Sequence, residues 1–113
     1  MITQFRPRDL NAWLAQLGPD AKPVVLDVRE PAELQIASVK PEGFALVTMP
    51  MGSVPVRLAE LDADQPIACL CHHGGRSMQV AQFLAHQGFS QVANIAGGIH
   101  AWAAERDPTL ATY

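Results

Sequence analysis

The sequence predicts an α/β fold, because short apolar runs typical of buried strands alternate along the chain with segments of helical spacing. Three such runs lie at residues 24–28, 66–71 and 92–95, and a turn signal and a helical segment follow each of them. The first run is rich in β-branched residues, which is typical of a parallel strand buried on both faces. Since open parallel sheets bind ligands at the carboxyl ends of their strands, we expect the site there.

The chain begins with a predicted short strand at residues 1–7 and a helix after it. Asp9 is placed to cap this helix, because aspartate side chains accept hydrogen bonds from the free N–H groups of a first turn. Apolar residues spaced three and four apart give the helix one buried face: Leu10, Trp13, Leu14 and Leu17. Trp13 is therefore expected to be a core residue, and Gly18-Pro19 ends the helix.

Polar residues gather at the end of the strand over residues 24–28. Asp27 closes the strand, and Arg29, Glu30 and Glu33 follow on a short helical turn that begins at a proline. Carboxylates at strand ends can serve as general acids or bases, cap a loop, or pair with an arginine such as Arg29. We favour the structural roles.

The middle of the chain contains the next predicted strand, at residues 44–48. The Met-Pro-Met-Gly loop at 49–52 either packs in the core, which we favour, or walls a substrate pocket, since methionine adapts to varied shapes. Ser53 is expected to cap a short helix, with Pro55 in the first turn, where proline is tolerated. The apolar residues of this helix would face inward: Val54, Leu58 and Leu61.

Composition limits the class of protein. The chain has 113 residues, of which 49% are hydrophobic and 17% charged, with a net charge of −3. These values predict one globular domain over residues 1–113, with a poorly ordered tail at 107–113. With no basic run, we expect neither nucleic acid nor a membrane surface as a partner.

The compartment is also predicted from the sequence. Residues 1–8 lack the apolar stretch of a signal peptide, and no segment approaches the ~20 apolar residues of a membrane span. Cys69 and Cys71, two residues apart in one predicted strand, make a poor disulfide pair. We therefore expect the reducing cytoplasm.

Cys71 is the candidate reactive residue. It follows the apolar run at 66–70, and Gly74-Gly75 then turns the chain into a helical segment at 78–84. The N–H groups of such a loop and of the helix start can gather around an anion, which lowers the pKa of a cysteine and yields the reactive thiolate. Arg76 adds a positive charge nearby. An isolated cysteine is usually a small apolar side chain, but these neighbours favour a reactive or anion-binding loop.

Three segments resemble signature sequences of the rhodanese-like family. Residues 71–77, Cys-His-His-Gly-Gly-Arg-Ser, resemble its active-site loop, residues 26–34 its first-strand motif, and residues 96–102 its C-terminal signature. The three occur in the family's order and span most of the chain. One segment departs from the family pattern, because Ala37-Ser38-Val39 stands where that pattern has Gly-His-Ile.

The resemblance implies a rhodanese-like α/β domain with a central, mostly parallel, five-stranded sheet and helices on both faces. It also implies a sulfurtransferase that takes a sulfane sulfur from thiosulfate or a persulfide donor, carries it as a Cys71 persulfide, and gives it to a thiol or protein-cysteine acceptor. Asp27 and Arg29 are expected to hold the fold near the site. No cofactor and no metal are expected. The remaining active-site loop consists of His72, His73, Gly74, Gly75, Arg76 and Ser77.

Other interpretations use the same residues. A cysteine-dependent phosphatase, or an arsenate reductase of this fold, also places a thiolate in an anion-binding loop, but phosphatases use Cys-x5-Arg, and here four residues separate Cys71 from Arg76. A metal site built from Cys69, Cys71, His72 and His73 is disfavoured, because ligands so close in sequence cannot easily surround one ion. A non-catalytic rhodanese-like binding module is disfavoured by the presence of Cys71.

Some roles stay open in the sequence. Arg76 either holds the loop closed or steers an anionic donor. His72 and His73 either attract anions or are simply exposed. Cys69 lies within the apolar run, and we expect it to be structural, with a pKa raised by burial.

Overall fold

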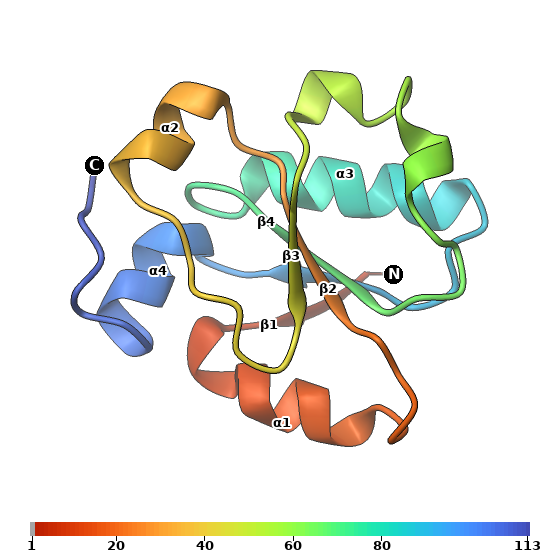
Figure 1. Cartoon of the computed structure of the whole chain (residues 1–113), viewed down its shortest axis with the longest axis horizontal. Coiled ribbons are helices and arrows are strands. Elements are labelled where there is room, and N and C mark those ends of the chain that lie inside the picture. Colours follow the sequence, from red (N-terminus) through yellow and green to blue (C-terminus); the bar gives the residue numbers. More distant parts are fainter. Residues whose placement is uncertain (1) are drawn as a thin grey trace.

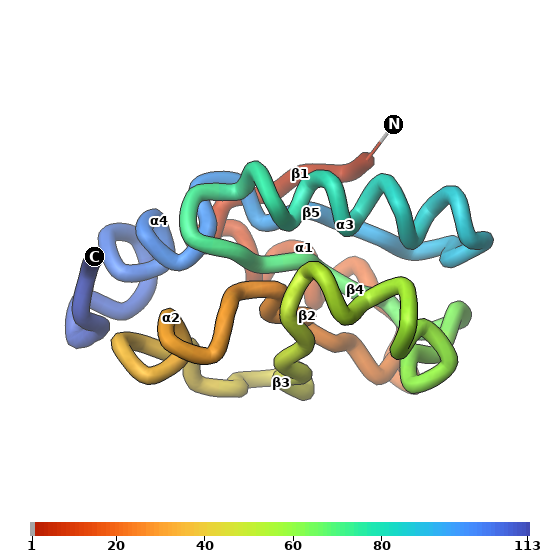
Figure 2. The backbone as a smooth tube through the Cα atoms, turned by 90° about the horizontal axis from the view of Figure 1, so that it is seen from above, coloured from red at the N-terminus to blue at the C-terminus, as the bar shows by residue number. Residues whose placement is uncertain are grey.

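A computed structural model describes residues 2–113; Met1, the first residue of the predicted domain and strand, lies outside the described part. Within that part the chain forms one five-stranded sheet in which each pairing is parallel (Figures 1 and 2). The strand order across the sheet is β1-β5-β4-β2-β3. The predicted sheet is thus confirmed. The strands are β1 (Thr3–Phe5), β2 (Val24–Asp27), β3 (Ala45–Thr48), β4 (Ile67–Leu70) and β5 (Val92–Ile95).

Helices cover both faces of the sheet, as predicted (Figure 1). Helices α1 (Leu10–Gln16) and α4 (Gly98–Glu105) pack on one face, and α3 (Gly75–His86) packs on the other. Helix α2 (Pro31–Ile36) connects β2 to β3. Because successive strand residues point to opposite faces, Val25 lies in the cluster under α1 and α4, whereas Leu26 lies in the cluster under α3.

The segment after β3 differs from the sequence prediction. It forms two short 3-10 turns, at Met51–Ser53 and Leu58–Glu60, in place of one helix capped by Ser53. That prediction is wrong because Gly52 and Pro55 both disfavour a continuous α-helix, and Ser53 ends the first turn rather than capping a helix. Val54 is nevertheless buried against the sheet, as the apolar pattern predicted.

The start of α1 also differs in detail. A 3-10 turn at Pro7–Asp9 leads into the helix, and the Asp9 side chain makes no capping hydrogen bond in the described structure. Leu10 is fully buried, whereas Trp13 lies at the edge of the core. The Trp13 ring stacks on Phe5 of β1 with centroids 5.1 Å apart.

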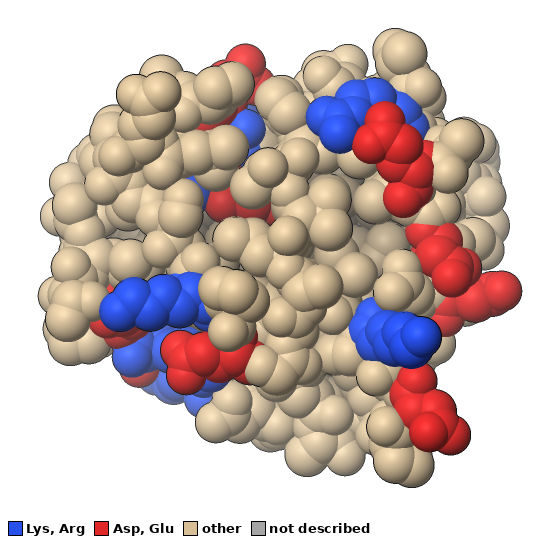
Figure 3. Space-filling model, viewed as in Figure 1, with Lys and Arg blue, Asp and Glu red and all other residues tan. Residues whose placement is uncertain are grey.

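Charged side chains are mixed on the surface. On the face shown in Figure 3, Lys and Arg side chains lie beside Asp and Glu side chains rather than in a patch of one sign. The exposed pair Arg57–Glu60, 2.9 Å apart, is one example of such mixing. Among residues 2–113, the structure contains no helix of the length and apolar character needed to cross a membrane.

A buried ion pair lies at the end of β2. Two guanidinium nitrogens of Arg29 donate to the Asp27 carboxylate at 2.8–3.1 Å, and neither side chain is exposed. Arg29 also donates to the carbonyl oxygens of Glu33, at 3.3 Å, and Ala37, at 2.8 Å. Arg29 therefore fastens α2 and the residue after it to the carboxyl end of β2.

Removing the Arg29 side chain should lower the stability of the fold. In Arg29→Ala the Asp27 carboxylate stays buried without its partner, so we expect the free energy of unfolding to fall by about 3–5 kcal/mol. Arg57→Ala, which breaks the exposed pair with Glu60, is the matched control and should cost at most about 1 kcal/mol. Urea unfolding of both variants measures the difference. Equal losses in the two would contradict a special role for the buried pair.

Candidate active site

The Cys71 sulfur lies at the base of the loop over residues 71–77, called the cysteine loop below. Its Sγ atom accepts hydrogen bonds from the backbone N–H groups of Gly74, at 3.1 Å, and Ser77, at 3.3 Å. Gly74 has φ +107°, a left-handed conformation that glycine adopts without strain, and α3 begins at the next residue. The loop thus turns two N–H groups of the helix start toward one sulfur atom.

A buried polar chain continues from the sulfur. The Cys71 thiol donates to Ser77 Oγ at 3.2 Å, and Ser77 Oγ donates to Asn94 Oδ1 at 2.6 Å. The amide nitrogen of Asn94 donates to the Gly74 carbonyl oxygen at 3.2 Å. Because a carbonyl oxygen can only accept, this bond fixes which end of the Asn94 carboxamide faces Ser77. Asn94, a residue of β5 that is 1% exposed, therefore orients both the hydroxyl and the turn beside the sulfur.

Helix α4 is hydrogen-bonded to the backbone of the cysteine loop. The N–H groups of Ile99 and His100 donate to the carbonyl oxygens of Cys71, at 2.9 Å, and His72, at 3.1 Å. This close approach requires glycine at position 98, where a Cβ atom would lie 2.4 Å from both of those oxygens and where φ is +59°. The Gly97-Gly98 turn therefore brings the third signature segment against the first.

A side chain at position 98 should disrupt this contact. In Gly98→Ala we expect the free energy of unfolding to fall by about 2–5 kcal/mol, since left-handed backbone and overpacking both add cost. Gly52→Ala is the matched control, because a Cβ atom there meets nothing within 4 Å, and it should change stability by no more than about 0.5 kcal/mol. Urea unfolding of the two variants provides the comparison. If Gly98→Ala were as stable as Gly52→Ala, the close contact between α4 and the cysteine loop would not be needed for stability.

Arg76 pairs with a carboxylate and not with the sulfur. Its guanidinium nitrogens lie 2.6 and 2.9 Å from the two carboxylate oxygens of Glu33 in α2. The hydrogen bond from Arg76 lowers the pKa of Glu33 to about 2 from its usual 4.5. Of the two functions left open for Arg76, this contact supports holding the loop in place. From the sequence, Glu33 was expected to cap a loop or to pair with Arg29. In the structure it pairs with Arg76 instead.

This pair should give a characteristic pH dependence. Because the pKa of Glu33 is lower in the folded protein than in the unfolded chain, the pair stabilises the fold above about pH 4.5 and is lost as the pH falls toward 2. Glu33→Gln should therefore be less stable than the unchanged protein at about pH 6, and this difference should shrink between pH 4.5 and 2. Urea unfolding across this range, with the exposed Glu42→Gln as control, measures it. A difference that is constant with pH would contradict the pairing.

Tyr113 lies over the same rim. Its hydroxyl donates to Glu33 at 2.7 Å and accepts from Arg29 at 3.1 Å. Its ring stacks on His72, with centroids 3.8 Å apart and planes 7° from parallel. The poor order expected for residues 107–113 stays a prediction, but in the structure the tail makes these contacts.

Cys69 lies apart from this chemistry. It is fully buried in the cluster beneath α3, and burial, with a smaller contribution from Cys71, raises the pKa of its thiol to about 12. Such a thiol stays protonated at neutral pH, which supports the structural role expected from the sequence.

The two methionines of the loop at 49–52 pack with the core cluster that contains Cys71. Met49 is fully buried. Met51 lines a surface cavity of about 240 Å³ between the 3-10 segment and α3, and Cys71 is not among the residues that line it. The favoured core role agrees with the burial of Met49.

Sequence reasoning missed several residues of the site. It gave no role to Asn94, His100 or Tyr113, and it did not pair Glu33 with Arg76. The signal for Asn94 was present, since a polar residue in an otherwise apolar buried run usually has a partner. Contacts such as Glu33–Arg76 depend on the strand order, which the sequence pattern does not specify.

Comparison with known proteins agrees with this geometry. The sequence model of the rhodanese-like domain family matches residues 10–105. A sulfurtransferase from Allochromatium vinosum is 36% identical over 98% of this chain and 97% of its own length. The thiosulfate sulfurtransferase GlpE from Vibrio cholerae is 33% identical over 89% of this chain and 91% of its own length. The chain therefore belongs to the rhodanese-like family, and its relatives include sulfurtransferases.

Another relative places a similar segment within a longer protein. A rhodanese-like/PpiC domain-containing chloroplast protein from Arabidopsis thaliana is 42% identical over 79% of this chain, which spans only 30% of that protein. Among solved structures, a rhodanese-like domain protein from Staphylococcus aureus superposes with a TM-score of 0.75 and 23% identity, covering 99% of each chain. The polysulfide-sulfur transferase from Wolinella succinogenes gives a TM-score of 0.67 at 27% identity, over 92% of this chain and 74% of its own.

Proposed function

We propose that this protein transfers a sulfane sulfur from thiosulfate or a persulfide donor to a thiol acceptor through a persulfide on Cys71. The observation that carries the proposal is the pair of backbone N–H groups, from Gly74 and Ser77, that converge on Cys71 Sγ. Donors fixed in this way stabilise negative charge on sulfur without reorganising during the reaction. The sulfurtransferase relatives support the same reaction class.

The reaction has two displacement steps. In the first, the Cys71 thiolate attacks the outer sulfur of the donor, a new sulfur–sulfur bond forms, the donor's own bond to that sulfur breaks, and sulfite leaves when the donor is thiosulfate. In the second, an acceptor thiolate attacks the outer sulfur of the Cys71 persulfide and the Cys71 thiolate returns. The N–H groups of Gly74 and Ser77 would stabilise negative charge on the Cys71 sulfurs in both steps.

Ser77 and Asn94 would assist the change of proton state. In the thiol form, Ser77 Oγ accepts from Cys71 and donates to Asn94. Once the thiol proton has passed to water, rotation of the Ser77 hydroxyl away from Asn94 would turn its O–H toward the sulfur and add a third donor. Arg76, held by Glu33, would keep the cysteine loop closed around the persulfide.

Access to the sulfur favours sulfur transfer over phosphate chemistry. Cys71 is only 1% exposed, so a reacting group must enter through a narrow opening. A terminal sulfane sulfur is one atom on a single bond, whereas a phosphoryl group brings three further oxygens that need donors. The four-residue spacing between Cys71 and Arg76, one shorter than in phosphatases, also favours sulfur transfer.

Dependence on reduced thiols makes the cytoplasm the compartment that suits this reaction.

Intact-mass measurement after incubation with thiosulfate tests the proposal. The unchanged protein should gain the mass of one sulfur atom, and Cys71→Ser should gain none, because the nucleophile is gone. Cys69→Ala is the matched control: it removes the other cysteine and should keep the mass gain, with a stability loss within about 0.5–3 kcal/mol. A gain that persists in Cys71→Ser, or disappears in folded Cys69→Ala, would overturn the assignment of Cys71 as the only sulfur carrier.

The rival activity can be measured on the same preparation. Thiosulfate:cyanide turnover should exceed hydrolysis of an aryl phosphate. Cys71-dependent hydrolysis that runs faster than sulfur transfer would replace this proposal with a phosphatase.

A further inference from the structure

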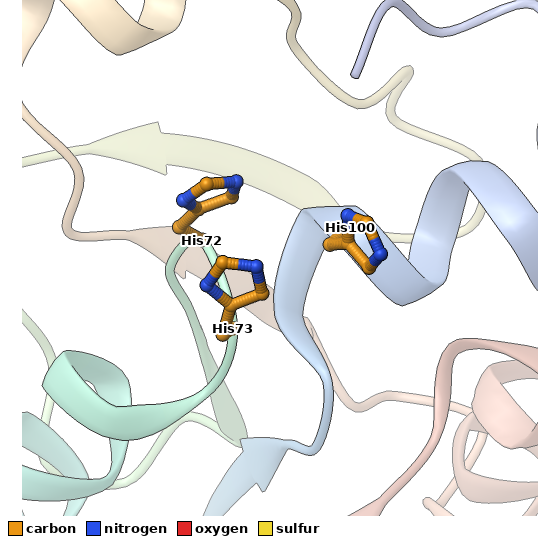
Figure 4. Close-up of side chains that lie close together, drawn as sticks. All are labelled: His72, His73 and His100. Atoms are coloured by element: carbon orange, nitrogen blue, oxygen red, sulfur yellow. The ribbon is translucent and has the colours of Figure 1, made fainter. Parts of the chain in front are cut away.

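Three histidines meet at the entrance of the cysteine loop. His72 and His73 belong to the loop, and His100 comes from the first turns of α4 (Figure 4). One imidazole nitrogen from each histidine lies within 4.8 Å of one from each of the other two. His72 is half-buried, while His73 and His100 are exposed.

The fold brings these side chains together through the backbone. The N–H group of His100 donates to the His72 carbonyl oxygen at 3.1 Å, which places the first turns of α4 directly beside the loop. The His73 ring then lies 3.8 Å from His72 and 5.2 Å from His100, measured between centroids. The cluster is therefore fixed by the same contact that holds Cys71 in place.

The chemistry of the cluster suits a transition-metal ion. Neutral imidazole is a strong ligand for Zn²⁺, Cu²⁺ and Ni²⁺. Arg76, in the same loop, is paired with Glu33, which offsets its repulsion of a cation.

The geometry requires only side-chain movement. Metal–nitrogen bonds of about 2.0–2.1 Å in a tetrahedron separate the ligand nitrogens by about 3.3 Å, so nitrogens spread over as much as 4.8 Å must draw together. The rings of His73 and His100 are exposed, so little packing opposes their rotation. His72 has competing contacts with Tyr113, since its ring stacks on the tyrosine ring and its Nε2 atom lies 2.7 Å from the Tyr113 backbone oxygen.

We propose that His72, His73 and His100 form a binding site for one divalent transition-metal ion, of the kind represented by Zn²⁺. Three imidazoles leave the fourth tetrahedral position for water or for a sulfur ligand. This set differs from the ligand set considered from the sequence, because Cys69 is buried in β4 and the Cys71 sulfur faces Gly74 and Ser77. The ion would lie at the entrance through which a sulfur donor reaches Cys71, and so would block transfer; this last step rests on the proposed function.

Zinc binding by equilibrium dialysis at about pH 7.5 tests the site directly. We expect one ion per chain and at least a tenfold, and up to about a hundredfold, weaker affinity in His100→Ala. His86→Ala is the matched control, since His86 is an exposed histidine at the end of α3 and outside the cluster, and it should bind zinc as the unchanged protein does. Cys71→Ser should also bind zinc unchanged. Undiminished affinity in His100→Ala, or a loss in Cys71→Ser alone, would overturn the three-histidine site.

A second measurement separates this site from the proposed reaction. Zinc should inhibit sulfur transfer by the unchanged protein and by His86→Ala at the same concentration, whereas His100→Ala should need at least about tenfold more. Equal inhibition of all three proteins would contradict the placement of the ion at the entrance. If the protein transfers no sulfur but binds zinc through His100, the site stands and the proposed function falls.

Discussion

The structure of the site depends on the contact between α4 and the cysteine loop. Two N–H groups at the start of α4 bind the carbonyl oxygens of Cys71 and His72. These bonds satisfy two donors that a helix start always leaves free, and they fix the position of the loop's backbone. The N–H groups of Gly74 and Ser77 are then the backbone dipoles that face Sγ. The contact with α4 and the two donors to the sulfur therefore belong to the same short loop.

Two ion pairs also stabilise the structure around this contact. Asp27 and Arg29 are buried at the end of β2, and Glu33 and Arg76 join α2 to the cysteine loop. Tyr113 bridges them, because its hydroxyl touches both Arg29 and Glu33. The carboxyl ends of β2 and β4, which are neighbouring strands, are therefore connected by charge as well as by the sheet.

The sequence was informative where local pattern determines structure. Apolar runs located β2, β4 and β5, and the Gly74-Gly75 pair located the turn after Cys71, because these features need no knowledge of distant residues. Local pattern failed at 53–61, where apolar spacing predicted a helix but Gly52 and Pro55 allowed only 3-10 turns. It also could not pair Asn94 with Ser77, since that contact exists only once β5 lies beside β4.

The two N–H groups that donate to sulfur have a consequence for observing the molecule. Most backbone N–H groups in a folded protein donate to oxygen, but those of Gly74 and Ser77 donate to the atom whose charge and substitution would change in every turnover of the proposed reaction. Their NMR chemical shifts and hydrogen-exchange rates depend on whether that atom is a thiol, a thiolate or a persulfide. These two amides are therefore built-in spectroscopic reporters of the state of Cys71, readable without any added label.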